Sequence, residues 1–410
     1  MSGITEIPGG VTVPEGFSAA STAAGIKYRD RTDMAMVFSK EPCECAGTFT
    51  SNKVKAACVK WDMEIAFSGR KLHGVVINSG IANACTGEEG FDTCRKTAEA
   101  VENALSVPAD SVAVASTGVI GMQLPVQKLV QGVEDMSKKL SSSEEAGTEA
   151  SKAIMTTDTV NKETAVKFTV GGREVHMGGM SKGSGMIHPN MCTMLAFITT
   201  DVNIEKSLLQ KALKEAVTDT FNMITVDGDT STNDTCMVMA NGLSGNEKIT
   251  SEGSDYDTFR EALFHVCRYL ARRMAGDGEG ATKLFEAKVV HAKSRTDART
   301  LARAVVGSNL SKAAIFGCDA NFGRFLCAMG YSGADFDEGD VELYFESSIG
   351  RLKVFDHGVP LDFDEEKAVS IMKEKEVTVF IDMNEGEDAA TAWGCDLTYD
   401  YVKINADYRT

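Results

Sequence analysis

Short apolar runs alternate with longer amphipathic stretches along the whole chain. The short runs are mostly about four to eight residues long and rich in Val, Ile, Thr or Phe, which predicts strands. They are residues 35–38, 74–78, 111–115, 165–170, 194–199, 287–292, 341–345 and 377–381. Apolar positions at helical spacing predict helices at residues 92–105, 125–140, 148–155, 205–222, 256–274, 296–306 and 365–375. The alternation predicts a mixed α/β (α+β) fold with layered helices on β-sheets.

The pattern of the stretch 256–274 is explained by burial in the core and indicates no function. Phe259, Leu263, Val266 and Leu270 form one stripe at helical spacing, which indicates a helix that faces the core. The chain contains only 7 Pro and no stretch that reads as a flexible linker or an internal repeat. Its length allows two domains, but composition marks no boundary between them.

Composition excludes several classes of protein. Apolar residues make up 43% and charged residues 25% of the chain, so a folded globular protein is expected rather than a disordered one. The net charge of −17 would be repelled by phosphate, so we expect neither a nucleic acid nor an anionic membrane as partner. No apolar run approaches the roughly 20 residues that a membrane span requires.

The N-terminus and the cysteines indicate a cytoplasmic protein. Residues 1–10 lack both a basic segment followed by an apolar one and an Arg-rich transit pattern. The chain has 11 Cys, and an odd number without a signal peptide favours reduced thiols. There is no C-x-x-C pair, so we expect no structural zinc and no metal site; most cysteines fit small buried hydrophobes.

The segment SKGSGMIHPNMCTML at residues 181–195 is unusual for a scaffold. A glycine-rich turn leads through a proline into Cys192 and Thr193, which directly precede an apolar strand. A nucleophile at the start of a buried strand would be held rigidly. His188 and Cys192 also suggest a Cys–His hydrolase, but the two lie four residues apart on a segment that a proline interrupts and need not face each other.

Three other segments have the composition of a binding site. ASTGVIG at residues 115–121 is a strand that ends in a small-residue turn, whose N–H groups could form an oxyanion hole. GDGEGATK at residues 276–283 is either a helix C-cap or a binding turn, and it is not a Walker loop. DGDTSTND at residues 227–234 resembles a calcium loop, but Thr232 and Val238 stand where Gly and Glu are needed.

These motifs together strongly resemble the ornithine acetyltransferases of arginine biosynthesis. The resemblance covers essentially the whole chain. Besides the segments above it includes GFSAASTAAGIK at 16–27, NSGIANACTG at 78–87 and the tail YVKINADYRT at 401–410. It implies a glutamate N-acetyltransferase that moves an acetyl group from N-acetylornithine to glutamate. Some members of this family also acetylate glutamate from acetyl-CoA.

The resemblance also implies that the chain cuts itself between Cys192 and Thr193. The products would be an alpha fragment, 1–192, and a beta fragment, 193–410, intertwined in one compact unit. Two fragments of each kind would assemble into a heterotetramer. Family members usually have Ala where this chain has Cys192, and Ala is common where it has His188; since Cys is also small, we expect the cut to occur.

An N-terminal Thr193 would carry both the nucleophile and its base. The cut creates an α-amino group, whose reference pKa is about 7.7–8.0, and this group can activate the neighbouring hydroxyl. The same hydroxyl would first attack the carbonyl of Cys192. The resemblance places the side chain of Thr117 and the N–H of Gly118 in the oxyanion hole. Its implied substrate-binding residues are Thr156 (or Thr157), Lys182, Thr193, Glu279, Asn405 and Thr410. No bound cofactor is expected, because the hydroxyl itself carries the acetyl group.

Two other functions compete with this one. An aminopeptidase or amidase would use the same N-terminal threonine with water as acceptor. A non-catalytic acidic binding protein would show no cut at all. Whether water or glutamate accepts the acetyl group therefore distinguishes the hydrolase from the transferase. The presence of two fragments distinguishes the transferase from a binding protein.

Overall fold

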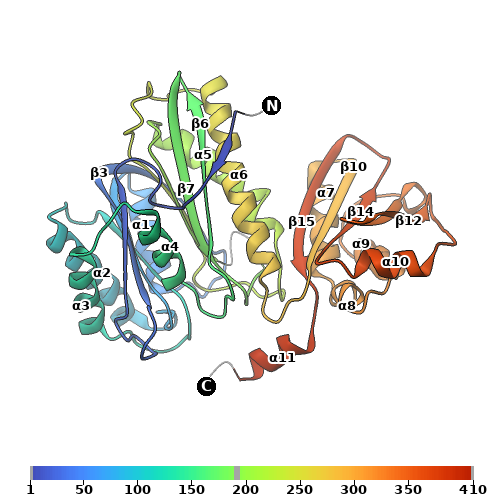
Figure 1. Cartoon of the computed structure of the whole chain (residues 1–410), viewed down its shortest axis with the longest axis horizontal. Helices are drawn as coiled ribbons and strands as arrows, with labels where there is room; N and C mark the ends of the chain where they lie inside the picture. The colour runs from blue at the N-terminus through green and yellow to red at the C-terminus, as the bar shows by residue number, and fades with distance from the viewer. Residues whose placement is uncertain (1–2, 189–193, 408–410) are drawn as a thin grey trace. The chain divides into compact units, whose positions relative to one another are not determined.

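The computed structural model describes residues 3–188 and 194–407, which divide into two compact units (Figure 1). One unit comprises Met1–Gly183, Asn190–Thr218 and Thr230–Leu270, and the other comprises Ser184–Pro189, Asp219–Asp229 and Ala271–Thr410. The predicted mixed α/β class, with helices on sheets, is confirmed. The last third of the chain builds a sheet of its own.

The first unit contains a nine-stranded sheet. Its strands are β1 (Thr5–Ile7), β2 (Phe17–Thr22), β3 (Met34–Phe49), β4 (Leu72–Asn78), β5 (Val112–Ser116), β6 (Lys162–Val170), β7 (Arg173–Lys182), β8 (Leu195–Thr200) and β9 (Thr235–Ala240). Its helices are α1 (Ala57–Phe67), α2 (Gly87–Leu105), α3 (Val126–Ser137), α4 (Glu144–Ala153), α5 (Lys206–Thr218) and most of α6 (Ser254–Gly276).

The strands follow the order β1-β6-β7-β8-β9-β3-β4-β5, with β2 also paired to β3. The long strand β3 joins the two halves: it pairs with β2 as far as Ser39, with β4 as far as Cys43, and with β9 from Glu44 onward. Its pairing with β4 shifts register between Phe38 and Cys43, an irregularity of the kind that bends a strand. The strands β8 and β9, which follow position 193, therefore lie between two groups of earlier strands in a single sheet.

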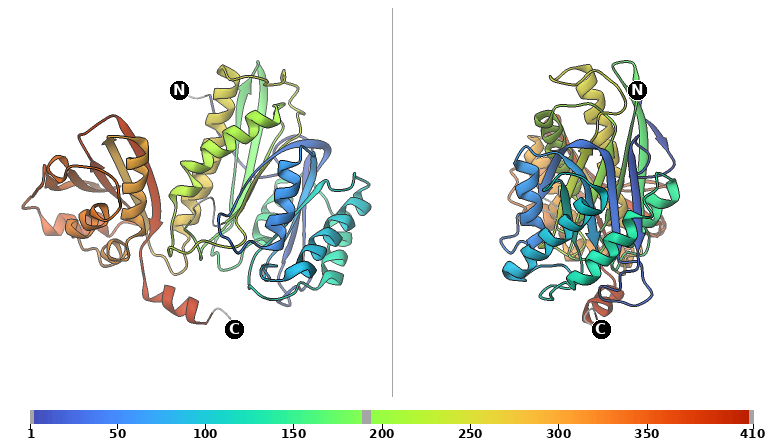
Figure 2. Two further views of the ribbon diagram at one scale, coloured as in Figure 1. Left: turned by 180° about the vertical axis from the view of Figure 1, so that it is seen from behind. Right: turned by 90° about the vertical axis from the view of Figure 1, so that its left-hand side faces the viewer.

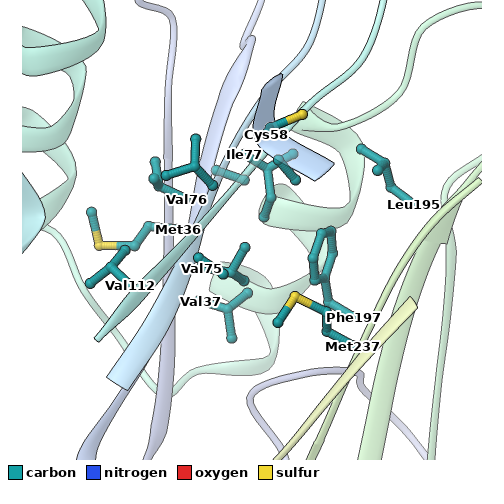
Figure 3. Packing of buried hydrophobic residues seen from close by; sticks show 14 of the residues in the cluster. Met36, Val37, Cys58, Val75, Val76, Ile77, Val112, Leu195, Phe197 and Met237 are labelled. Atoms are coloured by element: carbon teal, nitrogen blue, oxygen red, sulfur yellow. The ribbon is translucent and has the colours of Figure 1, made fainter. Parts of the chain in front are cut away.

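The core of this unit lies between the two halves of the sheet and under the helices. Figure 3 shows Val37 and Val75, from β3 and β4, close to Phe197 and Met237 of β8 and β9. All four side chains are at most 1% exposed. On the outside, Figure 2 shows α5 and α6 together over the strands β6 and β7. Burial on this scale supplies the main favourable free energy of folding.

Side chains of α1 complete the edge of β5, the last strand of the sheet. The Trp61 indole donates to the Val112 carbonyl at 3.1 Å, and a carboxylate oxygen of Asp62 accepts from the Val114 N–H at 2.8 Å. These bonds satisfy backbone groups that an edge strand otherwise leaves without partners. They also fix the strand that leads into Thr117.

The second unit contains a six-stranded sheet in the order β13-β12-β11-β14-β10-β15. Its strands are β10 (Leu284–Ala292), β11 (Glu342–Ser347), β12 (Gly350–Asp356), β13 (Val359–Pro360), β14 (Glu376–Asp382) and β15 (Asp388–Cys395). Its helices are α7 (Arg295–Gly307), α8 (Asn309–Gly317), α9 (Phe322–Gly330), α10 (Glu365–Met372) and α11 (Tyr399–Ala406), with short 3-10 turns η1 (Phe221–Met223) and η2 (Glu338–Asp340). Among the described residues, no helix is both long and apolar enough to cross a membrane.

Every strand and helix predicted from the pattern has a counterpart, with ends that differ by up to five residues, except that the strand predicted at 35–38 continues to Phe49. The pattern missed β7, β9, β12, β13 and β15, together with the helices α1, α8, α9 and α11 and the short strands β1 and β2. Strand β7 was not predicted because Gly178 and Gly179 interrupt its apolar run. A side chain at Gly178 would lie 1.9 Å from the Gly10 carbonyl oxygen, and Gly179 lies against Val266 and Leu270 of α6. Other segments of the same chain approach β7 closely at these two positions, which explains both glycines.

Most of the described cysteines are buried, whereas Cys85 and Cys327 are exposed. Burial raises the pKa of the Cys43 and Cys58 thiols to about 12. A thiol with so high a pKa is almost never a thiolate near neutral pH, so it is a poor nucleophile. Cys192 lies outside the described residues.

Candidate functional site

The predicted site residues fall into two clusters, one in each unit. Thr117, Gly118, Thr156 and Lys182 belong to the first unit, whereas Glu279 and Asn405 belong to the second. Three predicted residues lie outside the part that the structure describes: Cys192, Thr193 and Thr410.

Thr117 and Gly118 form a tight turn after β5. The Thr117 N–H donates to the Asn78 carbonyl at 3.0 Å, and the Val119 N–H donates to the Gly80 carbonyl at 3.1 Å. Gly118 has φ +130, and a Cβ there would lie 2.2 Å from the Gly80 carbonyl carbon. Only glycine fits this position. Among the described residues, none accepts a hydrogen bond from the Gly118 N–H, so this group can serve a ligand.

Two asparagines hold the turn from behind. The side-chain amide of Asn233 donates to the Ser116 carbonyl at 2.8 Å and to the Ala82 carbonyl at 2.5 Å. The Ser116 hydroxyl donates to the Asn78 side chain at 2.7 Å. Asn233 is 6% exposed, and Ser116 and Asn78 are at most 3% exposed. Buried, fully used amides of this kind keep a backbone turn in one conformation.

Lys182, the last residue of β7, lies beside the turn. Its ammonium group donates to the Thr117 hydroxyl oxygen at 3.4 Å, and both side chains are almost completely buried. Because the hydroxyl oxygen accepts this bond, its own hydrogen stays available for donation. The structure thus brings together a hydroxyl, a backbone N–H on the next residue and a positive charge.

A buried ion pair adjoins Lys182. The carboxylate of Asp158 accepts from the Lys162 ammonium at 2.7 Å, and both side chains have 0% exposure. Burial alone would raise the pKa of Asp158, but the charges of Lys182 and Lys162 outweigh it and hold that pKa far below its usual range. Asp158 is therefore ionised. Two ammonium groups and one carboxylate leave this cluster with a net positive charge, which suits an anionic group.

Thr156 is half-buried at the edge of the same cluster. Its N–H donates to the Asp158 carboxylate at 3.0 Å, and its carbonyl accepts from the Arg31 guanidinium at 3.3 Å. These bonds fix the backbone of Thr156 without using its hydroxyl. Thr157, the alternative at this position, is also half-buried, so the structure does not choose between the two.

The sheet register brings the chain after position 193 to this cluster. Leu195, the first residue of β8, lies opposite Lys182. On its other side β8 runs parallel to β9, and the Thr235 N–H donates to the Met194 carbonyl at 2.9 Å. The segment that follows Thr193 thus enters the middle of the sheet beside Lys182.

The second cluster surrounds Glu279, which is 7% exposed. Its carboxylate accepts from the side-chain amide of Asn405 at 2.8 Å, and its N–H donates to the Ser184 carbonyl at 2.8 Å. A Cβ at Gly185 would lie 2.4 Å from the Glu279 carboxylate. A side chain at Gly185 would therefore displace this carboxylate.

Helix α11 is attached to the glycine-rich turn that carries Glu279. The Thr398 hydroxyl donates to the Gly280 carbonyl at 2.7 Å and also caps the helix by accepting from the Tyr401 N–H. Gly280 has φ +70, and a side chain there would lie 2.7 Å from the Tyr401 nitrogen. These contacts place Asn405 within hydrogen-bond distance of Glu279.

Asp227 holds the segment upstream of the predicted cut. Its carboxylate accepts from the N–H groups of Met186 at 2.6 Å and Ile187 at 2.9 Å. The phenol of Tyr401 lies near the same carboxylate, and burial together with the charge of Asp227 raises its pKa well above the usual range. Asp227 is thus occupied by backbone donors.

Both ring nitrogens of His188 are in contact with described residues. Nδ1 lies 3.0 Å from the Thr225 hydroxyl, and Nε2 lies 3.3 Å from the Arg303 guanidinium. Burial lowers the pKa of His188, and the positive charge of Arg303 lowers it further. These contacts weigh against the Cys–His interpretation, which needs one of these nitrogens as a base.

Sequence reasoning missed the residues that hold the site in place. Asp158, Asn233 and Asp227 each satisfy backbone groups of segments that carry predicted site residues. Asp227 and Asn233 lie in the DGDTSTND motif at 227–234, and Asp158 directly follows the two candidate threonines, Thr156 and Thr157. Their side-chain types predict turns, but nothing in their spacing shows which distant backbone groups they bind.

One group of potential metal ligands lies on the surface of the second unit, among the described residues. Carboxylates of Glu342 and Asp356 lie close to His357. The Lys353 ammonium contacts these carboxylates at 2.9 and 2.5 Å. An ammonium group thus already supplies the positive charge here, and no second observation indicates an ion.

Comparisons with known proteins match nearly the whole chain. A family model described as "ArgJ family" matches residues 18–410. The "Arginine biosynthesis bifunctional protein ArgJ" of Caldanaerobacter subterraneus subsp. tengcongensis is 51% identical over 404 residues, which are 98% of this chain and 99% of that protein.

Two solved structures also match part of the chain. The crystal structure of arginine biosynthesis bifunctional protein ArgJ from Bacillus halodurans has 44% identity and a TM-score of 0.49, and covers 51% of this chain and 97% of that one. The ornithine acetyltransferase of Mycobacterium tuberculosis, complexed with ornithine, has 44% identity and a TM-score of 0.42, and covers 47% of this chain and 100% of that one.

Proposed function

Because this chain belongs to the ArgJ family, we propose that it moves an acetyl group from N-acetylornithine to glutamate. The similar proteins are named as bifunctional proteins of arginine biosynthesis, so an acetyltransferase acting on small molecules in that pathway is the function that fits. The second activity in the proposal is acetylation of glutamate from acetyl-CoA, which would be a co-substrate rather than a resident cofactor.

The proposed reaction has two steps on Thr193. The Thr193 hydroxyl attacks the acetyl carbonyl of N-acetylornithine while its own α-amine takes the proton. The C–N bond breaks, ornithine leaves with that proton, and an acetyl ester stays on the threonine. The amine of glutamate then attacks the ester, N-acetylglutamate leaves, and the hydroxyl is restored. Both steps pass through a tetrahedral oxyanion.

The observation that best supports this proposal is the turn at Thr117 and Gly118. A hydroxyl hydrogen and a backbone N–H are available on consecutive residues, and Lys182 brings a positive charge to the hydroxyl oxygen. Donors held in advance against a developing oxyanion lower the barrier without having to reorganise. The net positive charge around Lys182 would also attract the α-carboxylate that both substrates carry. Glu279, held by Asn405, would take a substrate ammonium group.

We further propose that the chain matures by cutting itself between Cys192 and Thr193. The pairing of β7 with β8 joins residues 173–182 to residues 195–200 in one sheet, so the fragments 1–192 and 193–410 would stay together. The family resemblance extends this to an assembly of two alpha and two beta fragments. A cytoplasmic location belongs to the same proposal, and cell fractionation would test it.

Initial-rate kinetics test the function. If Thr193 holds the acetyl group between two substrates, double-reciprocal plots at several glutamate concentrations will be parallel. Lines that intersect would show that both substrates must bind together. An amidase would instead release acetate from N-acetylornithine at the same rate with and without glutamate, and that result would replace the transferase with the hydrolase.

A further inference from the structure

Asp158 is a buried ionised group that the proposed reaction does not use. It lies just before β6, and no part of its side chain is exposed. An ionised carboxylate in such a place is costly unless it is paired and hydrogen-bonded. The partners of Asp158 therefore show what its presence achieves.

Each oxygen of the carboxylate binds a segment with a predicted substrate-binding residue. Oδ2 accepts from the N–H of Thr156 at 3.0 Å. Oδ1 accepts from the N–H of Gly183 at 2.7 Å, and Gly183 directly follows Lys182. Residues 156 and 183 lie far apart in the sequence, so one side chain fixes the distance between two separate segments.

Lys162 keeps this clamp in a single orientation. Its ammonium donates to Oδ1 at 2.7 Å and to the Val160 carbonyl at 3.2 Å. The residue is the first of β6 and pairs with Ser181 of β7, next to Lys182. The carboxylate is thus attached to the sheet at the point where Lys182 leaves it.

We propose that Asp158 is a positioning residue that sets the distance between Thr156 and Lys182 for the α-carboxylate of the substrates. Lys162 serves this role as the cation that holds the carboxylate. Asp158 does not touch the reacting atoms and acts only through its neighbours. The inference rests on the proposed function, in which Thr156 and Lys182 bind substrate.

Asp158→Asn is the direct test, because the amide has nearly the same shape but no charge. One of its two polar atoms must present N–H groups where the carboxylate accepts bonds, so at least one clamped segment is released. Charge-assisted hydrogen bonds of this kind predict a KM increase of about 10- to 100-fold for N-acetylornithine and glutamate. The kcat should stay within about threefold, since the oxyanion turn remains.

A second variant grades the effect. Asp158→Glu keeps the charge but moves the carboxylate by one C–C bond, about 1.5 Å, so its KM should lie between those of wild type and Asp158→Asn. If Asp158→Asn does not fold, the KM of Asp158→Glu decides. Rates are referred to the amount of cut protein measured by intact mass, which scores an effect on maturation separately.

Asp201 offers a matched control in the same unit. It is 1% exposed, and its carboxylate also accepts from two backbone N–H groups, those of His176 at 2.8 Å and Glu15 at 3.1 Å. It follows the opposite end of β8 from Leu195. Asp201→Asn should leave both KM values unchanged.

The outcomes separate this inference from the function on which it rests. A wild-type protein that transfers no acetyl group to glutamate contradicts the proposed function. A competent wild type together with wild-type KM values in both Asp158 variants contradicts only the positioning role. A KM that rises equally in Asp158→Asn and Asp201→Asn would show a general cost of losing a buried carboxylate, and it would also overturn the inference.

Discussion

Replacing Thr117 by alanine separates a catalytic hydroxyl from one that only fills a turn. The substitution removes the oxygen that accepts from Lys182 and the hydrogen that is proposed to stabilise the oxyanion. It leaves the backbone bonds of the turn and the Gly118 N–H in place. Thr117→Ser is the matched control, because it keeps the hydroxyl and removes only a methyl group.

The structure lets the two effects be compared in size. Loss of one oxyanion donor costs about 2.7–4 kcal/mol in the transition state, a 10²–10³-fold lower rate. The bond to Lys182 is long, 3.4 Å, so its loss should cost no more than about 1.5 kcal/mol of stability, or a few degrees in melting temperature. The missing methyl in Thr117→Ser should cost about 0.8 kcal/mol.

The assay is single-turnover acetylation of protein that is already cut. Material that is already cut matters because slow maturation would otherwise resemble slow catalysis. We expect a rate 10²–10³-fold below wild type for Thr117→Ala, roughly the value of one donor, and a rate within about tenfold of wild type for Thr117→Ser. A Thr117→Ala rate within about twofold of wild type, together with a lower melting temperature, would remove Thr117 from the mechanism.

Three further predictions follow from particular contacts. Gly185→Ala places a methyl group 2.4 Å from the Glu279 carboxylate and should displace this carboxylate, while the Thr117 turn stays intact. The KM of the amine-bearing substrates, measured by steady-state kinetics, should therefore rise. An unchanged KM would show that Glu279 does not bind substrate. Burial raises the pKa of Asp62 well above its usual range. The folded state therefore keeps a proton that the unfolded state releases above about pH 4, so the stability of the wild type falls as pH rises from there. Asp62→Asn should melt at a higher temperature than wild type at pH 7 and lose this advantage near pH 4; equal melting temperatures at pH 7 would refute the reasoning. Burial and the positive charge of Arg303 lower the pKa of His188, so the stability of the folded protein should decrease as pH falls below about 6.5. His188→Gln should remove this decrease from a plot of melting temperature against pH. A plot that matches wild type would exclude His188 as the cause of the decrease.

The sequence pattern predicted elements well where a single side of the element faces the core. Helix α6 is an example, because its apolar stripe at Phe259, Leu263 and Val266 is fully buried. The pattern did not predict β7, where Gly178 and Gly179 lie so close to the backbone of Gly10 and to α6 that larger strand-forming residues would not fit. Such contacts depend on distant parts of the chain, which periodicity does not report.

The candidate site divides in the same way. Motif resemblance identified Thr117, Gly118 and Lys182, and the fold brings these three together. It did not identify Asp158 or Asn233, because their roles consist of hydrogen bonds to backbone groups far away in sequence. A side chain that positions other residues has no chemical signature of its own, and its function is visible only in its contacts.

The central claim is that Thr193 becomes an N-terminal nucleophile that carries the acetyl group. An intact-mass measurement of the purified protein, before and after incubation with N-acetylornithine alone, tests both parts at once. We predict two fragments of roughly 20 and 23 kDa, by even mass per residue, and a gain of one acetyl group on the fragment that begins at Thr193. Thr193→Ala should remain a single unacetylated chain; a cut in that variant, or an acetyl group on the fragment 1–192, would contradict the account.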